Sequence, residues 1–241
     1  MRGLLEEYDA LARTGRVGRA VVTQVWGSAP RPEGASLLAT EDGRIAGSVS
    51  GGCVETAAAE EIQAAIRRGT PKRVGWGVTH ERAWEMGLSC GGQIEVFVEP
   101  EVRAEVLEAA RRHTGSVVAT VIGGAAPPGS GLLVEEDGSR RRFGSLPATL
   151  EEPVATAALA ALSTLGSIVS TVEAPEGPVE IFLEVFPRRP TLLVFGGVHI
   201  AMALTRMAKP LGFRTVVADG RQLLLSSDSP IKLGSSAHER T

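Results

Sequence analysis

Hydrophobic and polar positions recur along the chain with two periods, one typical of helices and one typical of strands. At residues 4–14 apolar side chains follow helical spacing up to Gly15, which predicts a short amphipathic helix. A second helix is predicted at about 54–68, because Gly69-Thr-Pro71 would end it. Strands are predicted where apolar and β-branched residues run together between turn residues, at 19–26, 35–40, 44–49 and 94–99.

The same order of elements recurs roughly a hundred residues later. Two stretches make the match specific: Leu132-Leu-Val-Glu-Glu-Asp-Gly138 parallels Leu37-Leu-Ala-Thr-Glu-Asp-Gly43, and Gly144-Ser-Leu146 parallels Gly47-Ser-Val49. The other matching segments are a helix at 102–114, a strand at 116–122, a helix at 153–165 and a strand at 179–184. We therefore predict an α/β fold in which a duplicated unit forms one pseudo-symmetric domain over residues 1–187, with repeats at about 1–100 and 101–187.

The last part of the chain follows the linker-like Pro187-Arg-Arg-Pro190. A strand at 191–195, a glycine turn, a helix to Lys209 and a strand ending in Asp219 form the βαβ opening of a dinucleotide-binding domain. Asp219 follows Gly196 at about the 20-residue distance expected of a ribose-binding carboxylate. Gly196, Gly197 and Asp219 are therefore candidate nucleotide-binding residues. The second glycine of that fingerprint is replaced by Val198, and we expect an incomplete Rossmann-like unit with a polar tail over residues 190–241.

Composition narrows the class of protein. With 43% hydrophobic and 22% charged residues the 241-residue chain resembles ordinary soluble proteins, and a net charge of −3 gives no sign of a nucleic-acid partner. Two cysteines do not make a disulfide scaffold, so we expect reduced thiols in a cytoplasmic protein. The uncharged stretch 154–172 is rich in Ala, Ser and Thr and contains Gly166, which argues against a membrane span.

The stretch Gly47-Ser-Val-Ser-Gly-Gly-Cys-Val-Glu55 carries the main candidate for chemistry. A cysteine between glycines and a helix start is expected to meet bare backbone N–H groups and the positive end of the helix dipole, which bind anions and lower a thiol pKa. Cys53, with Gly51 and Gly52 beside it, is thus a candidate to hold sulfur, a metal or an electrophile. Glu55 is a candidate proton donor or acceptor near the thiol.

Plainer interpretations of both residues are a small buried hydrophobe at a tight turn and an ordinary acid in a first helical turn. The second repeat reads Pro147-Ala-Thr-Leu-Glu151 at the matching place and has neither the glycines nor the cysteine. A folding requirement should occur in both repeats, so this asymmetry favours a function for Cys53.

Cys90, Gly91 and Gly92 lie in a segment at 79–92 that the second repeat lacks. If the two cysteine loops converge, both thiols share one ligand. A zinc site with His80 and a regulatory disulfide are the alternatives.

Two further candidates lie outside the cysteine loops. In the loop Gly27-Ser-Ala-Pro-Arg-Pro-Glu-Gly34, Ser28 and Arg31 are candidate anion-binding groups, although a plain strand connection also needs Pro and Gly. His199, at the start of the last predicted helix, is a candidate base or phosphate contact, or a helix cap.

Three stretches closely resemble the XdhC/CoxI family: Gly27-Ser-Ala-Pro-Arg-Pro-Glu-Gly34, Gly43-Arg-Ile-Ala-Gly-Ser-Val-Ser-Gly-Gly-Cys-Val-Glu55 and Gly87-Leu-Ser-Cys-Gly-Gly-Gln-Ile-Glu-Val96. The stretch 193–201 and Asp219-Gly-Arg221 resemble that family's C-terminal Rossmann domain, which is shortened here. The resemblance covers about residues 1–222. It implies an accessory protein, more a chaperone than an enzyme, for molybdenum hydroxylases such as xanthine dehydrogenase and carbon monoxide dehydrogenase.

Such proteins bind the molybdenum cofactor, keep it while a cysteine desulfurase installs a terminal sulfur, and pass it to the apoenzyme. By resemblance, Cys53 falls on the cofactor-linked cysteine and is expected to contact the molybdenum or its sulfur. The hypothesis is then a cytoplasmic, homo-oligomeric chaperone whose two glycine-rich loops donate N–H groups to the cofactor's phosphate. The alternatives are an NAD(P)-dependent oxidoreductase and a degenerate, non-catalytic scaffold.

Overall fold

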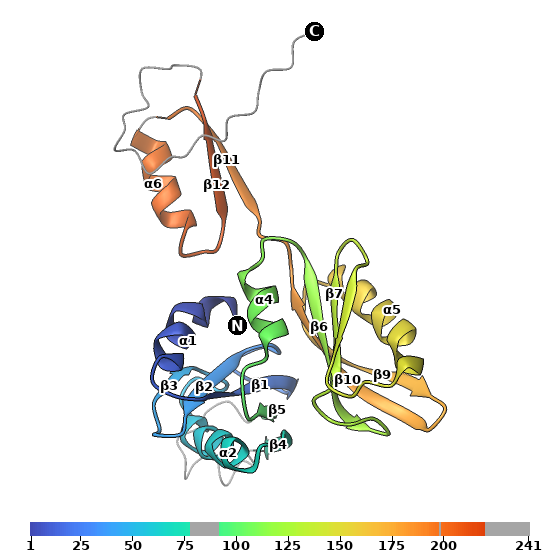
Figure 1. Ribbon diagram of the computed structural model, residues 1–241. Coiled ribbons are helices and arrows are strands. Elements are labelled where there is room, and N and C mark those ends of the chain that lie inside the picture. Colours follow the sequence, from blue (N-terminus) through green and yellow to red (C-terminus); the bar gives the residue numbers. More distant parts are fainter. Residues whose placement is uncertain (78–91, 198, 220–241) are drawn as a thin grey trace. The chain divides into compact units, whose positions relative to one another are not determined.

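A computed structural model describes residues 1–77, 92–197 and 199–219 (Figure 1). The chain divides into two compact units, Met1–Pro187 and Arg188–Thr241. The described part of the first unit contains two five-stranded sheets in which every strand pair is antiparallel. The second unit contributes a parallel pair of strands.

The first repeat forms one sheet with the strand order β3-β2-β1-β5-β4. Its strands are β1 (Val17–Trp26), β2 (Ser36–Thr40), β3 (Ile45–Gly47), β4 (Lys72–Gly77) and β5 (Gln93–Glu99). Its helical segments are the 3₁₀ turn η1 (Arg2–Leu4), α1 (Leu5–Ala12) and α2 (Glu55–Arg68). Helix α2 ends at Gly69, whose φ of 72° is left-handed, as the sequence predicted.

The second repeat forms a sheet with the order β8-β7-β6-β10-β9. This is the same order as in the first sheet, with every strand number higher by five. Its strands are β6 (Ser116–Gly124), β7 (Gly131–Glu135), β8 (Arg140–Phe143), β9 (Ile168–Ala174) and β10 (Gly177–Phe186). Its helical segments are α4 (Ala104–Arg111), the 3₁₀ turn η2 (Ala148–Leu150) and α5 (Glu151–Leu162). The strand order confirms the predicted duplication.

The two sheets also share an irregularity. In β1 the pairing with β5 shifts between Val22 and Gln24, and in β6 the pairing with β10 shifts between Val121 and Gly123. The edge strands β4 and β9 were not predicted, because β4 has glycines at alternate positions and β9 begins within the uncharged stretch 154–172. That stretch divides between α5 and β9, and no helix among the described residues is long and apolar enough to cross a bilayer.

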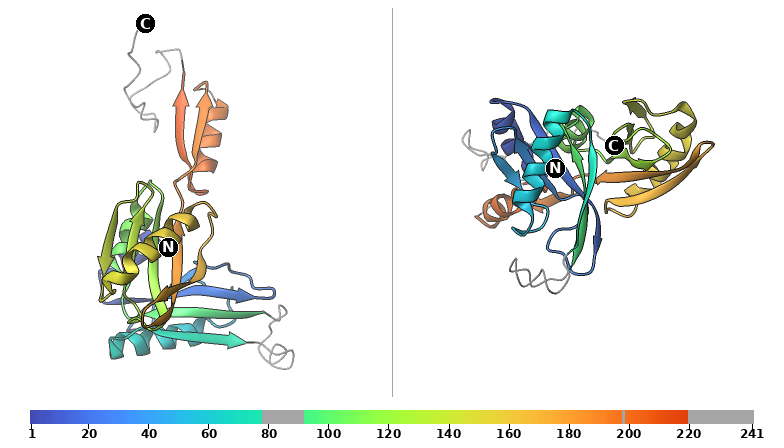
Figure 2. Two further views of the ribbon diagram at one scale, coloured as in Figure 1. Left: turned by 90° about the vertical axis from the view of Figure 1, so that its right-hand side faces the viewer. Right: turned by 90° about the horizontal axis from the view of Figure 1, so that it is seen from below.

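Each sheet buries one face under a helix of its own repeat. Ala20 and Val22 of β1 face the cluster under α2, and Val121 of β6 faces the cluster under α5. Side chains one position away point to the opposite face, as a strand requires. There Val21, Phe97, Ile122 and Phe182 form a cluster between the sheets, so α2 and α5 lie on the outer faces of the pair (Figure 2).

Two arginines and four glutamates flank this cluster, and we call the whole set the seam. Arg19 is 1% exposed and forms ion pairs with Glu99 of its own sheet and Glu184 of the other. Arg73 in the same way joins Glu95 to Glu180. Strand pairing shows which residues of the two repeats correspond. Arg19 pairs with Glu99 in the first repeat, and at the matching position of the second repeat Val118 pairs with Glu184. In the same way Arg73 pairs with Phe97, and at the matching position Val169 pairs with Phe182.

The second unit consists of β11 (Thr191–Phe195), α6 (His199–Ala208) and β12 (Arg214–Ala218). The strands run parallel, with Thr191 paired to Arg214 and Phe195 to Ala218. The predicted order of strand, glycine turn, helix and strand is therefore confirmed.

Candidate functional site

Residues 48–54, which we call the Cys53 loop, connect β3 to α2. Three glycines in and before the loop have left-handed φ values, 86° at Gly47, 79° at Gly51 and 119° at Gly52. A Cβ atom on Gly47 would lie 2.3 Å from the carbonyl oxygen of Ser36, so no larger residue fits there. The glycines therefore serve the backbone path of the loop.

The carboxylate of Glu55, the first residue of α2, lies at the centre of the Cys53 loop. Six donors of the loop point to its two oxygens. Oε1 accepts hydrogen bonds from Ser48 Oγ (2.7 Å), Val49 N (3.2 Å) and Ser50 N (2.9 Å). Oε2 accepts from Ser50 Oγ (2.6 Å), Gly52 N (2.8 Å) and Val54 N (3.2 Å).

Two serine hydroxyls accept the remaining backbone N–H groups. Ser48 Oγ accepts from Gly51 N at 2.8 Å, and Ser50 Oγ accepts from Cys53 N at 2.9 Å. Every backbone N–H from residue 49 to residue 54 thus has a side-chain acceptor within the loop and Glu55. The sequence led us to expect bare N–H groups around Cys53, and the structure differs because these side chains already bind them.

This environment also decides the ionisation of Glu55. Partial burial raises the pKa of the carboxyl, but the hydrogen bonds from Ser50, Ser48 and the loop backbone outweigh it and lower the pKa to about 2. Glu55 is therefore a carboxylate at neutral pH and a weak proton acceptor there.

Cys53 is half-buried and packs against the edge of the cluster beneath α2. A Cβ on Gly51 would lie 3.3 Å from Pro30 Cγ, and one on Gly92 would lie 2.3 Å from the Ser28 carbonyl oxygen. The loop at residues 27–34, which we call the Ser28 loop, thus lies beside both Gly51 and Gly92. Cys90, Gly91 and His80 lie outside the described residues, within which no group of three His, Cys, Asp or Glu side chains could hold a metal ion.

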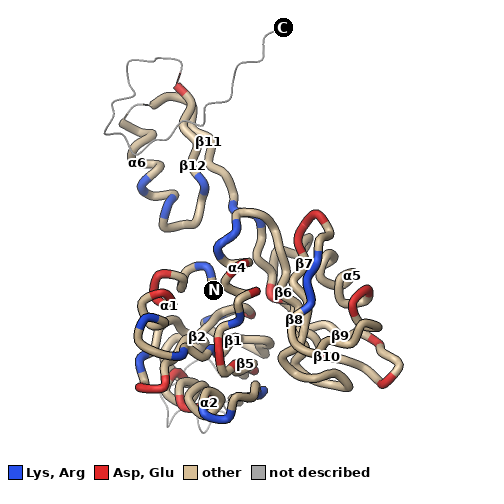
Figure 3. Tube along the Cα trace, in the orientation of Figure 1, with Lys and Arg blue, Asp and Glu red and all other residues tan. Residues whose placement is uncertain are grey.

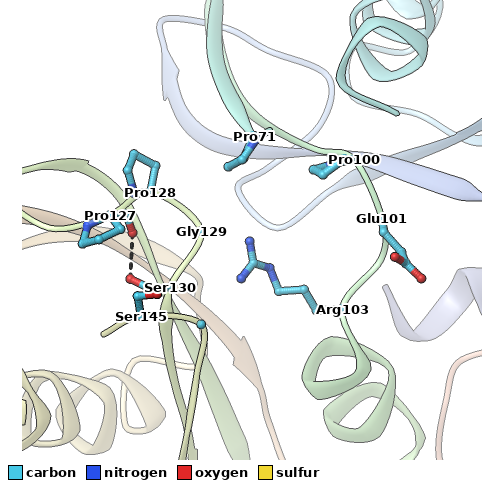
Figure 4. Close-up of a pocket in the computed structure, with 10 residues that line it drawn as sticks. Pro71, Pro100, Glu101, Arg103, Pro127, Pro128, Gly129, Ser130 and Ser145 are labelled. Carbon is cyan, nitrogen blue, oxygen red and sulfur yellow. Dashed lines mark hydrogen bonds between the residues drawn. The ribbon is translucent and has the colours of Figure 1, made fainter. Parts of the chain in front are cut away.

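Arg31 lines a cavity of about 470 Å³ between the repeats, together with Arg2, Glu184 and Ser167. A second cavity, of about 340 Å³, lies at the position that the pseudo-symmetry relates to the first. It is lined by Arg103 and by prolines of both repeats (Figure 4). Arg103 donates to Glu99 at 2.5 Å and lies 5.1 Å from the centre of the Phe143 ring. Arg31 and Ser28, three positions apart in the same loop, thus have different surroundings: Arg31 lines the larger cavity, and the Ser28 carbonyl lies against Gly92.

In the second unit the three candidate residues lie together. Gly196 has a φ of 102° and donates to the Ala218 carbonyl at 2.8 Å, and Gly197 N donates to the Asp219 carboxylate. His199 begins α6. Nucleotide binding by these residues stays a prediction.

The sequence analysis overlooked the roles of Ser48 and Ser50. A capping box pairs a serine with a glutamate three positions later. Here Ser50 and Glu55 stand five positions apart, with two glycines making up the difference. The signal was present, but at an unfamiliar spacing.

Comparison with known proteins agrees with the sequence motifs. Residues 10–77 match the XdhC and CoxI family. A probable xanthine dehydrogenase subunit of Bacillus subtilis (strain 168) is 30% identical over 217 residues, which are 86% of this chain and 61% of that protein. The molybdenum cofactor insertion chaperone PaoD of Escherichia coli (strain K12) is 41% identical over 80 residues, 32% of this chain and 24% of that protein.

A crystal structure of a xanthine dehydrogenase from Bacillus halodurans has a similar fold. Its TM-score is 0.65 at 22% identity, over 91% of this chain and 63% of the other. The chain thus spans less than two thirds of each of these proteins. The resemblance predicted from the motifs is confirmed: residues 10–77, which include the Cys53 loop, match the XdhC and CoxI family.

Proposed function

We propose that the protein is a cytoplasmic accessory factor that binds the molybdenum cofactor and delivers it to an apo molybdenum hydroxylase such as xanthine dehydrogenase or carbon monoxide dehydrogenase. The observation that carries the proposal is the family match over residues 10–77, which contains the complete Cys53 loop. The relative named as a molybdenum cofactor insertion chaperone supports it. The proposal includes sulfuration of the cofactor by a cysteine desulfurase and a homo-oligomeric state.

We propose that Cys53 is the residue that contacts the molybdenum cofactor. A thiolate is a soft ligand that suits molybdenum or its sulfur ligands. The side chain is half-buried, and the Ser28 loop packs on neighbouring Gly51. The donor set fits the metal end of the cofactor better than its phosphate, because the amides of Gly51 and Gly52 are already bound by Ser48 and Glu55. Cys90, Gly91 and Gly92 are the second group proposed to contact it.

The test is the cofactor content of the purified protein. The wild type, Cys53→Ala and Cys90→Ala should be purified from cells that make molybdenum cofactor. Pterin fluorescence after oxidative denaturation and molybdenum by elemental analysis are then measured. We expect a near-stoichiometric signal in the wild type and its loss in Cys53→Ala. An unchanged signal in a folded Cys53→Ala protein would remove Cys53 from the site, and an empty wild type would contradict the proposal.

The second unit supports a separate nucleotide site as a second candidate. The specific observation is that Asp219 reaches the Gly197 amide at the start of α6, where a dinucleotide fold binds ribose and pyrophosphate. NAD(P) at 100 times its dissociation constant should stabilise the protein by about 2.7 kcal/mol. A thermal shift that is present in the wild type and absent in Asp219→Ala would support this site, and no shift in either would remove it.

A further inference from the structure

We propose that Glu55 is a positioning residue: its carboxylate is the internal anion around which the Cys53 loop closes, and it holds Cys53 in place without exchanging a proton with the thiol. The role of Cys53 itself rests on the function proposed above. The inference concerns how the loop is built, and it can be tested on the protein without cofactor.

The first argument is the number of donors. A carboxylate has about four lone-pair directions on its two oxygens. Six donors of the loop already lie between 2.6 and 3.2 Å from the Glu55 oxygens. An external anion could reach the loop amides only by displacing this carboxylate or the two serine hydroxyls that accept from Gly51 N and Cys53 N. The loop is therefore a closed structure that presents Cys53, and its amides are not an open phosphate site.

The second argument comes from the other repeat. Glu151 begins α5 as Glu55 begins α2. The residue with a left-handed φ that follows the helix, Gly69 or Leu165, lies the same number of positions after the glutamate in both repeats. Yet Glu151 pairs with Arg140 at 3.1 Å and Arg142 at 3.3 Å, on the basic stretch beside β7 (Figure 3). The preceding residues form η2 instead of a glycine loop. A carboxylate at this helix start does not by itself create the arrangement, which occurs only where the cysteine is.

The third argument concerns the proton. Each oxygen of the Glu55 carboxylate already accepts three hydrogen bonds from the loop, so no lone pair is left over to accept the Cys53 proton. Ser48 and Ser50 face the carboxylate as donors, and no carboxylate or basic side chain is hydrogen-bonded to it in the described part of the chain. A structural anion, and not a proton shuttle, is the role that this environment favours.

The experiment uses Glu55→Ala, with Glu151→Ala as the matched control. Removal of the Glu55 carboxylate leaves the loop donors without an acceptor, and about 50 mM formate should refill the position by binding the folded state alone. We expect formate to raise the melting temperature of Glu55→Ala and to leave the wild type and Glu151→Ala unchanged. Phosphate in place of formate tests whether the vacated position also accepts a larger anion.

Cys53 supplies a second readout that a merely stabilising role would not move. Alkylation of Cys53, followed by mass spectrometry of its peptide, should be about tenfold faster in Glu55→Ala than in the wild type because the loop opens locally. Formate should slow it again. If Glu55→Ala does not fold, Glu55→Gln, which keeps one acceptor oxygen but leaves no space for formate, replaces it in the alkylation assay alone.

Two results would overturn the inference: a folded Glu55→Ala protein that formate does not stabilise, or wild-type alkylation rates in both Glu55 variants. Neither assay requires the cofactor. A wild type that binds no cofactor would therefore contradict the proposed function while leaving this inference standing, and the reverse outcome is equally distinguishable.

Discussion

The two repeats share a scaffold, and the loop that carries the candidate cysteine differs between them. Both sheets have the same strand order, the same shift in pairing, and a left-handed glycine in the Pro-rich loop, Gly34 in one and Gly129 in the other. Between the third strand and the helix, however, the first repeat has the hydrogen-bonded Cys53 loop and the second has η2. The strand order, the pairing shift and the loop glycine, which both repeats share, therefore serve folding, and the Cys53 loop, which only the first has, is the candidate for function.

The charges of the seam are distributed unequally between the two repeats. The four glutamates obey the pseudo-symmetry, but both arginines belong to the first repeat, and their counterparts are Val118 and Val169. Two carboxylates facing each other across an interface need one cation between them, and a second arginine would bring like charges together. The glutamates can therefore occur in both repeats, but the arginine between them can come from only one. For this reason the two repeats cannot replace each other in the seam.

The largest predicted effect is at Arg19. Arg19→Met leaves Glu99 and Glu184 buried at 2% and 5% exposure without the cation between them. Breaking a buried ion pair in this way costs about 3 to 5 kcal/mol. Urea unfolding should show a loss of that size in the free energy of unfolding.

A compensated variant sharpens the same comparison. Arg19→Met combined with Glu184→Gln removes the carboxylate nearest to the lost guanidinium, while Glu99 keeps Arg103. We expect the pair of changes to recover part of the lost stability. A single Arg19→Met variant as stable as the wild type would show that the seam is not held by this charge.

The sequence predicted most of the scaffold because turn residues and apolar runs are local signals. Gly69, Asp42-Gly43 and the repeated apolar strands all fall where they were expected. The seam could not be predicted, because Arg19 and Glu184 are 165 positions apart and each looks like an exposed charge within its own strand. At the site, Cys53 was recognisable by its glycines, but the closure of its amides depended on side-chain contacts that no spacing rule describes.

The second prediction compares the two helix-start carboxylates. Because the folded pKa of Glu55 is about 2 and its ordinary value is 4.5, its stabilising contribution is complete above about pH 4.5 and is lost as pH falls toward 2. A shift of this size corresponds to about 3 kcal/mol, which solvent screening of a partly exposed group reduces to ~1–2 kcal/mol.

Glu55→Gln should therefore lower stability by about that amount at pH 7, and the gap to the wild type should close between pH 4.5 and 2. Thermal unfolding at a series of pH values measures both. Glu151→Gln is the control. An equal effect of the two substitutions would mean that the Cys53 loop adds nothing to an ordinary helix start.

The third prediction concerns the residues that follow the two helices. Gly69 has a φ of 72°, and its counterpart Leu165 has a φ of 56° with 69% of its surface exposed. A left-handed leucine costs about 1–2 kcal/mol, part of which the freedom of glycine in the unfolded chain offsets. Leu165→Gly should stabilise the protein by about 0.5–1 kcal/mol, and Gly69→Ala should destabilise it by about 1 kcal/mol. Thermal denaturation tests both, and changes of the same sign would contradict the equivalence of the two positions.

The smallest predicted effect is at Arg73, the second cation of the seam. Its side chain is 29% exposed, and its partners Glu95 and Glu180 are 18% and 42% exposed, so water screens all three charges. Replacing it with the residue of the second repeat, Arg73→Val, should cost only about 0.5 kcal/mol, because exposed ion pairs contribute little. Added salt should shrink even that difference. Chemical denaturation of Arg73→Val and of Arg19→Met then compares the free energy of unfolding that is lost at an exposed and at a buried arginine with matching partners. A loss at Arg73 as large as that at Arg19 would mean that the seam depends on the number of its cations and not on how deeply each is buried.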